Sequence, residues 1–240
     1  MTRCFLADKI KNDVSIFQKE RIDMKRIAGI SERLLECAKS EFLNQGFQAA
    51  SIREIAKKAG TSARAVYTRF PNKEGLFDAI VSPVSDGLIE RYQNYANQFW
   101  PKNAGGNGTA AISSDDTAIY MDMIDYIYDH KDEFLLMQTS LEGKWHTALI
   151  EALTDNNISY VSKWTGLAGG AGNEKKLMMN VLHMLTNSFY ASMFEPLRHD
   201  MNRREARFYM EKLCAFFVAG MDRLLKQNTA SKTISFKKSR

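Results

Sequence analysis

The sequence is poor in cysteine, proline and glycine, and each shortage excludes a class of protein. Its three cysteines, Cys4, Cys37 and Cys214, have neither the even count of a disulfide framework nor the paired spacing of a zinc knuckle. This usage fits a reducing cytoplasm. Only 4 prolines and 14 glycines occur in 240 residues, so long stretches lack helix breakers. We therefore expect an all-α protein.

Long apolar runs are also missing. Nowhere do about 18 uncharged apolar residues follow one another, and residues 1–30 mix acidic and basic side chains without the apolar segment of a signal peptide. Hydrophobic residues make up 45% and charged residues 25% of the chain, which is average for a globular protein. The expected location is cytoplasmic, with no membrane partner.

Negative charge is scarce at both ends of the chain. Residues 1–30 and 31–75 each carry a net charge of +3 and residues 226–240 carry +5, whereas residues 76–225 contain 13 basic and 19 acidic side chains. This division predicts a small part that binds a polyanion, joined to an acidic part that nucleic acid would repel. By themselves the charges fit equally well a mixed-charge helical protein with basic termini.

The first strong helical pattern covers residues 31–44, where apolar residues recur at spacings of three and four. Gly46 follows, at the position expected for a left-handed C-terminal cap. A second, short helix begins at the capping-box sequence Ser51-Ile52-Arg53-Glu54 and ends at Gly60. A third short helix at 63–69 would complete a helix-turn-helix.

This third helix has a polar outer face. With 100° per residue, Val66 and Phe70 point to the core, whereas Arg64, Ala65 and Thr68 point to solvent. A long cation, a hydroxyl and small methyl groups suit the major groove of DNA. A helical hairpin with solvated polar side chains would give the same spacing.

The same region resembles the DNA-binding domain of the TetR/AcrR transcriptional regulators. The matching motifs lie in the family's order and spacing over about fifty residues, at Ser31–Ala38, Phe42–Phe47, Ser51–Ala56, Ala59–Ser62, Val66-Tyr67 and Phe70–Phe77. Arg64 departs from the family pattern, which commonly has glycine there, and this leaves the operator sequence open.

The resemblance implies an N-terminal three-helix DNA-binding domain and a larger C-terminal helical domain for ligand binding and dimerisation. It also implies a homodimeric repressor that a small-molecule effector releases from a palindromic operator in double-stranded DNA. With the face analysis, it assigns base reading to Ala63, Arg64, Ala65 and Thr68. It assigns phosphate contacts to Ser51, Thr61, Tyr67, Arg69 and Lys73.

For two of these residues, Lys73 and Tyr67, physical chemistry bears on the assigned role independently of the resemblance. Lys73 would stand in the first turn of a helix, where its charge opposes the macrodipole, and a bound phosphate would explain that placement. For Tyr67 the alternative is a ring packed at the edge of the core.

The chain is expected to divide into a basic extension at 1–30, the helix-turn-helix domain at 31–76, a regulatory and dimerisation domain at 77–226, and a basic, unstructured tail at 227–240. The regulatory helices are expected at 73–100 with a bend or end at Pro83, then at 116–129, 134–141, 143–165, 174–194 and 203–226. Glycine-rich loops are expected at 101–116 and 166–173.

The acidic region contains no complete metal or catalytic pattern. It lacks the two Glu-x-x-His pairs of a diiron bundle, a Gly-rich phosphate loop and a nucleophile elbow. Two weaker groupings of possible metal ligands are incomplete. One is Glu142 with His146, and the other consists of Asp125, Asp129, His130 and Glu133. We expect no enzyme activity, no metal and no cofactor, with an all-helical enzyme or carrier as the alternative.

Methionine and aromatic side chains are dense in the same region, which is typical of an adaptable apolar pocket, although each of them alone is more often core. The expected pocket residues are Tyr126, Trp145, His146, Met184 and Phe189. A ligand among them could swing the helix that begins at Lys73. Control by a protein partner is the alternative to a small molecule.

Two apolar stripes at helical spacing predict an intersubunit four-helix bundle. One consists of Leu177, Val181, Met184, Leu185 and Ser188, and the other of Met210, Leu213, Phe217, Gly220 and Leu224. The alternative is that these stripes belong to the internal core.

Overall fold

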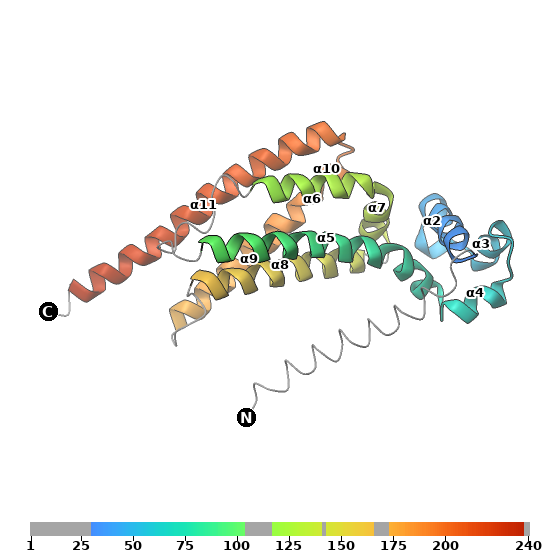
Figure 1. The fold of residues 1–240 in the computed structure, drawn as a ribbon, viewed down its shortest axis with the longest axis horizontal. Coiled ribbons are helices and arrows are strands. Elements are labelled where there is room, and N and C mark those ends of the chain that lie inside the picture. The colour runs from blue at the N-terminus through green and yellow to red at the C-terminus, as the bar shows by residue number, and fades with distance from the viewer. Residues whose placement is uncertain (1–29, 104–116, 141–142, 166–172, 238–240) are drawn as a thin grey trace, which may run out of the picture. The chain divides into compact units, whose positions relative to one another are not determined.

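The computed structural model describes residues 30–103, 117–140, 143–165 and 173–237, and all regular structure within them is helical (Figure 1). The chain divides into an N-terminal unit, Met1–Ile80, and a C-terminal unit, Val81–Arg240. The predicted extension at 1–30 and most of the two predicted loops lie outside the described residues. The all-α prediction is confirmed.

The N-terminal unit contains α2 (Ile30–Ala49), α3 (Ile52–Lys58), α4 (Ala63–Arg69) and the first turns of α5 (Lys73–Asn103). Gly46 interrupts α2 with φ 75° and ψ 161°, so a positive φ occurs where the sequence predicted a cap. The turn lets Phe47 stack on Phe42 at 5.6 Å between ring centroids, and both rings meet the edge or face of Phe77 at 5.3 Å. This aromatic cluster fills the centre of the unit.

Serine hydroxyls cap both short helices. Ser51 Oγ accepts a hydrogen bond from the Glu54 N–H at 3.5 Å, and Ser62 Oγ accepts one from the Ala65 N–H at 3.2 Å. The capping box predicted that Glu54 would accept from the Ser51 N–H, but that N–H donates to the carboxylate of Glu41 on α2. A residue of the preceding helix thus completes the cap.

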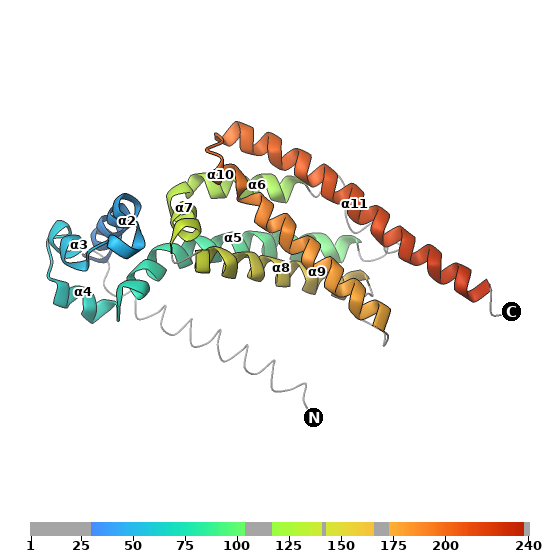
Figure 2. The ribbon, with the colours of Figure 1, turned by 180° about the vertical axis from the view of Figure 1, so that it is seen from behind.

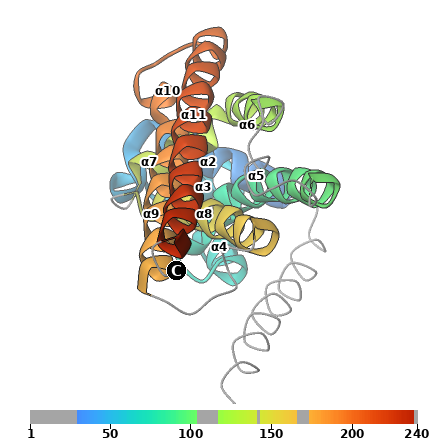
Figure 3. The ribbon, with the colours of Figure 1, turned by 90° about the vertical axis from the view of Figure 1, so that its left-hand side faces the viewer.

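The C-terminal unit is a bundle built from the rest of α5 together with α6 (Thr117–Asp129), α7 (Lys131–Thr139), α8 (Lys144–Thr165), α9 (Asn173–Met193), α10 (Glu195–Arg198) and α11 (Arg203–Lys237). Within it α8 lies beside α9 and α11 lies beside α6 (Figures 1 and 2). Figure 3 shows α8 between α5 and α9. None of the described helices is long and apolar enough to span a membrane.

Helix α5 continues past Pro83, where the sequence predicted a bend or an end. Pro83 itself is exposed, whereas Val81, Val84 and Leu88 are buried at helical spacing. Burial of this stripe outweighs the one backbone hydrogen bond that proline removes.

Gly87 lets α5 approach α6 closely. A Cβ at Gly87 would overlap the hydroxyl of Tyr126 and lie 3.0 Å from its Cζ. The Tyr126 ring also lies under the guanidinium of Arg91, 4.5 Å from its centroid, and Arg91 pairs with Asp122 at 2.9 Å. A glycine, a cation and a tyrosine thus fix the contact between the two helices.

Helix α11 is longer than predicted. It continues to Lys237, so most of the segment 227–240 that was expected to be unstructured is helical. The expectation relied on the loss of apolar periodicity after Gln227. That inference was wrong over residues 227–237, where the helix continues; propagation costs far less than nucleation, and no glycine or proline follows Gly220 to end it.

Candidate DNA-binding site and regulatory core

Helix α4 presents the predicted outer face. Val66 and Phe70 are 1% and 6% exposed, whereas Arg64 and Thr68 are exposed and Ala65 is half-buried. The predicted orientation is therefore confirmed for Val66, Phe70, Arg64 and Thr68, whereas Ala65 is less exposed than expected. Thr68 Oγ donates to the Arg64 carbonyl at 2.9 Å, which leaves the oxygen free to accept. Arg64 forms no hydrogen bond or ion pair with the described residues, so its guanidinium is available to a ligand.

The residues around this face differ in their accessibility. Tyr67 is 52% exposed, which disfavours the alternative of a packed ring. Ser51 and Thr61 are half-buried at the starts of α3 and the turn before α4. Arg69 is half-buried, its Nη1 lies 3.5 Å from the Ala65 carbonyl, and its buried Nε has no hydrogen-bond partner among the described residues.

Lys73 has protein partners. Its Nζ donates to the carbonyl of Gln48 at 2.9 Å and to that of Ala50 at 3.2 Å, and it lies 4.9 Å from the centroid of the Phe47 ring. The position of this lysine in the first turn of α5 is thus explained within the chain. These carbonyls offset the unfavourable interaction with the helix macrodipole, so the placement of Lys73 does not by itself require a bound phosphate, and the phosphate contact stays a prediction.

Glu41 is a structural residue that the sequence analysis missed. It is 6% exposed on the inner face of α2, and its carboxylate lies 2.6 Å from Nζ of Lys58 on α3. The hydrogen bond from Lys58 lowers the pKa of Glu41, with burial opposing it and the Ser51 N–H assisting. The sequence signal that could have revealed this residue is a single carboxylate, next to Phe42, within the otherwise apolar stripe of α2.

Comparison with known proteins agrees with this geometry. Residues 34–80 match the family described as bacterial regulatory proteins, tetR family. The chain is 35% identical over 75 residues to the HTH-type transcriptional repressor KstR2 of Mycobacterium tuberculosis, a match that covers 30% of this chain and 38% of the repressor. It is 35% identical over 52 residues to the uncharacterised HTH-type regulator YvkB of Bacillus subtilis, which covers 22% and 28% of the two chains.

Residues 34–80 of this chain are thus similar to the DNA-binding segment of the tetR family, and the matches show no more of the chain than that segment as related in sequence.

Solved structures support the TetR fold beyond the matched segment. A TetR-family regulator from Mesorhizobium loti has a TM-score of 0.54 at 17% identity, covering 81% of this chain and 97% of that one. A regulator of the TetR/AcrR family from Aquifex aeolicus has a TM-score of 0.51 at 17% identity, covering 77% and 96%. The curated relatives, in contrast, are matched over less than two-fifths of their length.

In the C-terminal unit the expected pocket residues do not form one cluster. Tyr126 and His146 belong to a chain of rings in which Tyr126 meets Phe134 at 6.3 Å, Phe134 meets Phe194 at 5.7 Å, and Phe194 meets His146 at 4.9 Å. Trp145 is half-buried with Lys144 over its ring.

Phe189 lies in a second cluster, where its ring contacts Tyr120, Tyr190 and Phe217 at 4.8, 5.5 and 4.8 Å between centroids. Met184 lies in neither cluster. It is 59% exposed and so does not belong to the core of the single chain, and its two expected roles, in a ligand pocket and at a subunit interface, stay predictions. Exposed and buried methionines have the same spacing in the sequence, which is why the two could not be separated.

The second cluster adjoins a polar group that sequence reasoning did not find. Asn157 on α8 donates to the hydroxyl of Tyr92 on α5 at 2.8 Å and reaches that of Tyr190 on α9 at 3.4 Å. Tyr190 is fully buried, and this burial raises its pKa well above the usual value. One amide therefore connects three helices in the regulatory core.

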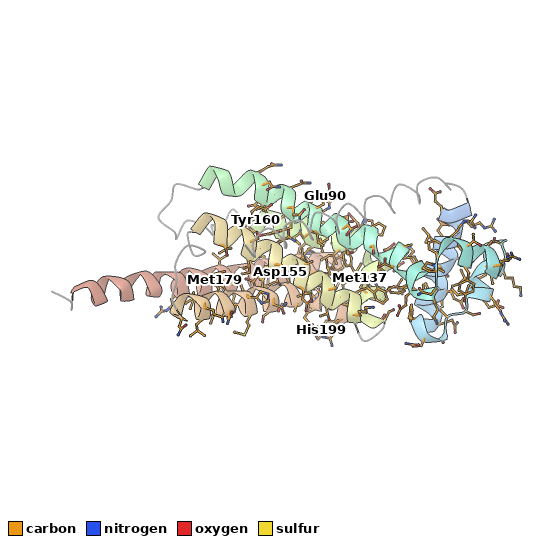
Figure 4. The ribbon with its side chains drawn as sticks, turned by 90° about the horizontal axis from the view of Figure 1, so that it is seen from below. Glu90, Met137, Asp155, Tyr160, Met179 and His199 are labelled. Atoms are coloured by element: carbon orange, nitrogen blue, oxygen red, sulfur yellow. The ribbon has the colours of Figure 1, made fainter. Side chains whose placement is uncertain are left out.

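Two further hydrogen bonds connect α5 to α8. Gln93 Nε2 donates to Asn156 Oδ1 at 2.7 Å, and the Tyr160 hydroxyl donates to Asn97 Oδ1 at 2.7 Å. Figure 4 shows Tyr160 on α8, on the side of α5. Each helix contributes two polar residues one turn apart, so the contacts follow both helices in parallel.

The predicted dimer stripe of α11 needs correction. Met210 is fully buried in the chain's own core and Phe217 packs on Phe189, whereas Phe208 and Phe216 are 63% and 76% exposed. The helix carries two apolar stripes, and periodicity does not tell which of them faces inward. On α9 the prediction fits better, because Leu177, Met184 and Leu185 are exposed at 64%, 59% and 38%.

The acidic side chains once considered as metal ligands have other partners. Asp125 pairs with Arg207, and Asp129 pairs with Arg203 at 2.6 Å, so both join α6 to α11. No group of three or more potential metal ligands occurs in the part of the chain that the structure describes. Glu142 lies outside it.

His146 is expected to make the stability of the C-terminal unit depend on pH, because its pKa is lowered. Burial lowers the pKa of His146, Arg198 lowers it further, and its buried Nε2 has no hydrogen-bond partner among the described residues. Because the unfolded imidazole has a pKa of about 6.5, protonation favours the unfolded chain below that pH. The free energy of unfolding should therefore be highest above about pH 6.5 and fall below it.

This expectation can be checked by measuring the thermal unfolding temperature of wild type and His146→Phe above and below about pH 6.5. The variant should lose less stability on acidification than the wild type. His199→Gln, at an exposed imidazole, controls for the loss of a histidine as such. An identical acid response in wild type and His146→Phe would contradict the assignment.

Proposed function

We propose that this chain is a homodimeric repressor that binds a palindromic operator through α3 and α4 and leaves it when a small molecule binds to the C-terminal unit. The observation that carries the proposal is the orientation of α4, whose buried Val66 and Phe70 hold Arg64 and Thr68 in solvent. The match to the repressor KstR2, over 75 residues of this chain, supports repression.

The proposed contacts follow from this orientation. Arg64 can donate two hydrogen bonds to a guanine edge, and the methyl groups of Ala63 and Ala65 can lie against thymine. Thr68 adds a hydroxyl. The proposed phosphate contacts are Ser51, Thr61, Tyr67, Arg69 and Lys73, since backbone contacts position a reading helix without specifying sequence.

Dimerisation is proposed through the outward faces of α9 and α11. In the single chain these faces expose large apolar side chains to water, and a second copy would cover them. The exposed residues are Leu177, Met184, Leu185, Phe208 and Phe216. Val181, Ser188, Leu213, Gly220 and Leu224 of the predicted stripes flank these residues. A two-fold dimer presents two α4 helices to two half-sites, as a palindromic operator requires.

The effector is proposed to be uncharged and apolar or amphipathic. In the described part of the C-terminal unit no Asp, Glu, Lys or Arg side chain is buried, so an ionic molecule in its core would lack a counter-charge. The clusters around Phe189 and Tyr126 offer apolar rings, tyrosine hydroxyls and the Asn157 amide. Helix α5 begins at Lys73 and continues without interruption to Asn103, which supports a mechanical link to α4.

Arg64→Ala should cost about 1–3 kcal/mol at one operator position and relax the base preference there. Sequencing duplexes that the protein selects from a random pool measures this preference. Arg204→Ala, an exposed arginine on α11, is the matched control and should leave every position unchanged. If the preference of Arg64→Ala equals that of wild type at all positions, α4 reads DNA through other residues.

Met184→Glu with Phe216→Glu should give folded monomers that no longer bind a palindromic duplex, because two buried carboxylates would disfavour the interface. Sedimentation at micromolar concentration measures the association. Ala148→Glu, at an exposed position on α8, should remain dimeric. A wild-type chain that sediments as a monomer would rule out the interface.

A neutral amphipathic compound that changes tryptophan fluorescence should also weaken operator binding, because an effector acts only through different affinities for the two states. A compound library titrated in both assays measures the coupling. If compounds bind without any change in DNA affinity, control by a protein partner is favoured. If the purified protein selects no duplex at all, the alternative of a helical enzyme or carrier is favoured.

A further inference from the structure

One carboxylate, that of Glu41 on α2, binds both ends of the short helix α3. Its Oε2 lies 2.6 Å from Nζ of Lys58, the last residue of α3. The same carboxylate accepts a hydrogen bond from the N–H of Ser51, the residue that caps the start of α3. The ends of a seven-residue helix lie about 10 Å apart, and the long lysine side chain bridges that separation. A single side chain thus connects α2 to the first and the last turn of α3.

Glu41 is buried where a charge is costly. It is 6% exposed, and its neighbours on the inner face of α2, Leu34, Ala38 and Phe42, are 0%, 0% and 1% exposed. No other charged side chain is buried in the part of the chain that the structure describes. An apolar residue would continue this stripe without the cost of desolvation. What the carboxylate adds is therefore its two directed contacts with α3.

The orientation of α3 is passed on to α4 by a tight turn. The N–H groups of Ala59, Gly60 and Thr61 all donate to carbonyls of α3, at 2.9, 3.1 and 2.9 Å. Gly60 has a positive φ of 72°, and Ser62 then caps α4. Because these bonds leave the connection little freedom, a displacement of α3 would displace α4 as well.

From this geometry we infer that Glu41 is a positioning residue for DNA binding, which holds both ends of α3 against α2 and so orients the face of α4 that carries Arg64. As an anion it would be repelled by phosphate, so it acts through the helices that it holds. The consequence for DNA rests on the proposed function, whereas the contacts themselves are a property of the free chain.

Removing the carboxylate separates positioning from simple electrostatics, because the two effects have opposite signs. Glu41→Met keeps a long side chain in the apolar stripe and removes both acceptor oxygens. The loss of a negative charge from the N-terminal unit should by itself strengthen binding to a polyanion. If Glu41 positions α3, the variant should instead bind more weakly, by a factor of about ten or more, to a duplex that the wild-type protein selects from a random pool.

Two further variants make this comparison specific. Glu36→Gln removes an exposed negative charge from the same helix and should bind that duplex at least as tightly as the wild type. Glu41→Gln keeps one acceptor oxygen, so its affinity should lie between those of the wild type and Glu41→Met. It serves the same measurements if the methionine variant loses the fold.

Hydrogen exchange on the free protein gives a readout that needs no DNA. Backbone amides of residues 51–60 should exchange faster in Glu41→Met than in the wild type, because α3 is released at both ends. Amides of residues 121–128 in α6 should keep the wild-type rate, which distinguishes a local release of α3 from a general loss of stability. Glu36→Gln should leave both segments unchanged.

If Glu41→Met binds the duplex as tightly as the wild type or more tightly, the inference is overturned, because only the electrostatic effect would remain. Unchanged exchange at residues 51–60 would overturn it as well. If the wild-type protein selects no duplex, the proposed function fails, and the exchange comparison still decides whether Glu41 holds α3.

Discussion

A helix of seven residues does not persist in water through its own hydrogen bonds, and the proposed reading helix α4 has that length. It depends on burial of Val66 and Phe70, on the Ser62 cap, and on the cluster of Phe42, Phe47 and Phe77 around which the N-terminal unit packs. Since the same two buried side chains fix the rotation of α4, they also decide which residues face DNA. Stability and recognition in this unit therefore have one origin.

The N-terminal unit could be predicted closely because its short helices have one apolar stripe each. A single stripe determines the buried face, and Gly46 and Gly60, both at positive φ, mark the turns. The sequence could not show that Glu41 completes the cap at Ser51 or that Lys73 binds backbone carbonyls, because those partners lie 10 and more residues away. Charged side chains with distant backbone partners have no periodic signature.

The C-terminal unit was predicted as a set of helices but not as a packed core. Helix α11 has apolar side chains on more than one face. The sequence alone therefore does not tell whether Met210 or Phe216 faces the core, and only the packing of α11 against α6 and α9 decides it. The polar centre around Asn157 was missed for a related reason. An asparagine in a helix is usually solvated, and only the approach of Tyr92 and Tyr190 from two other helices makes it a junction.

The paired side chains along α5 and α8 make helix register discrete. Gln93 and Asn97 stand opposite Asn156 and Tyr160, and because both helices run in the same direction the pairs repeat at one-turn intervals of about 5.4 Å. A slip of one turn would bring Asn97 opposite Asn156 and restore one bond, whereas a smaller slip would leave both pairs unsatisfied. A displacement of α5 along α8 would therefore break both hydrogen bonds before either could form again, so these pairs disfavour gradual sliding.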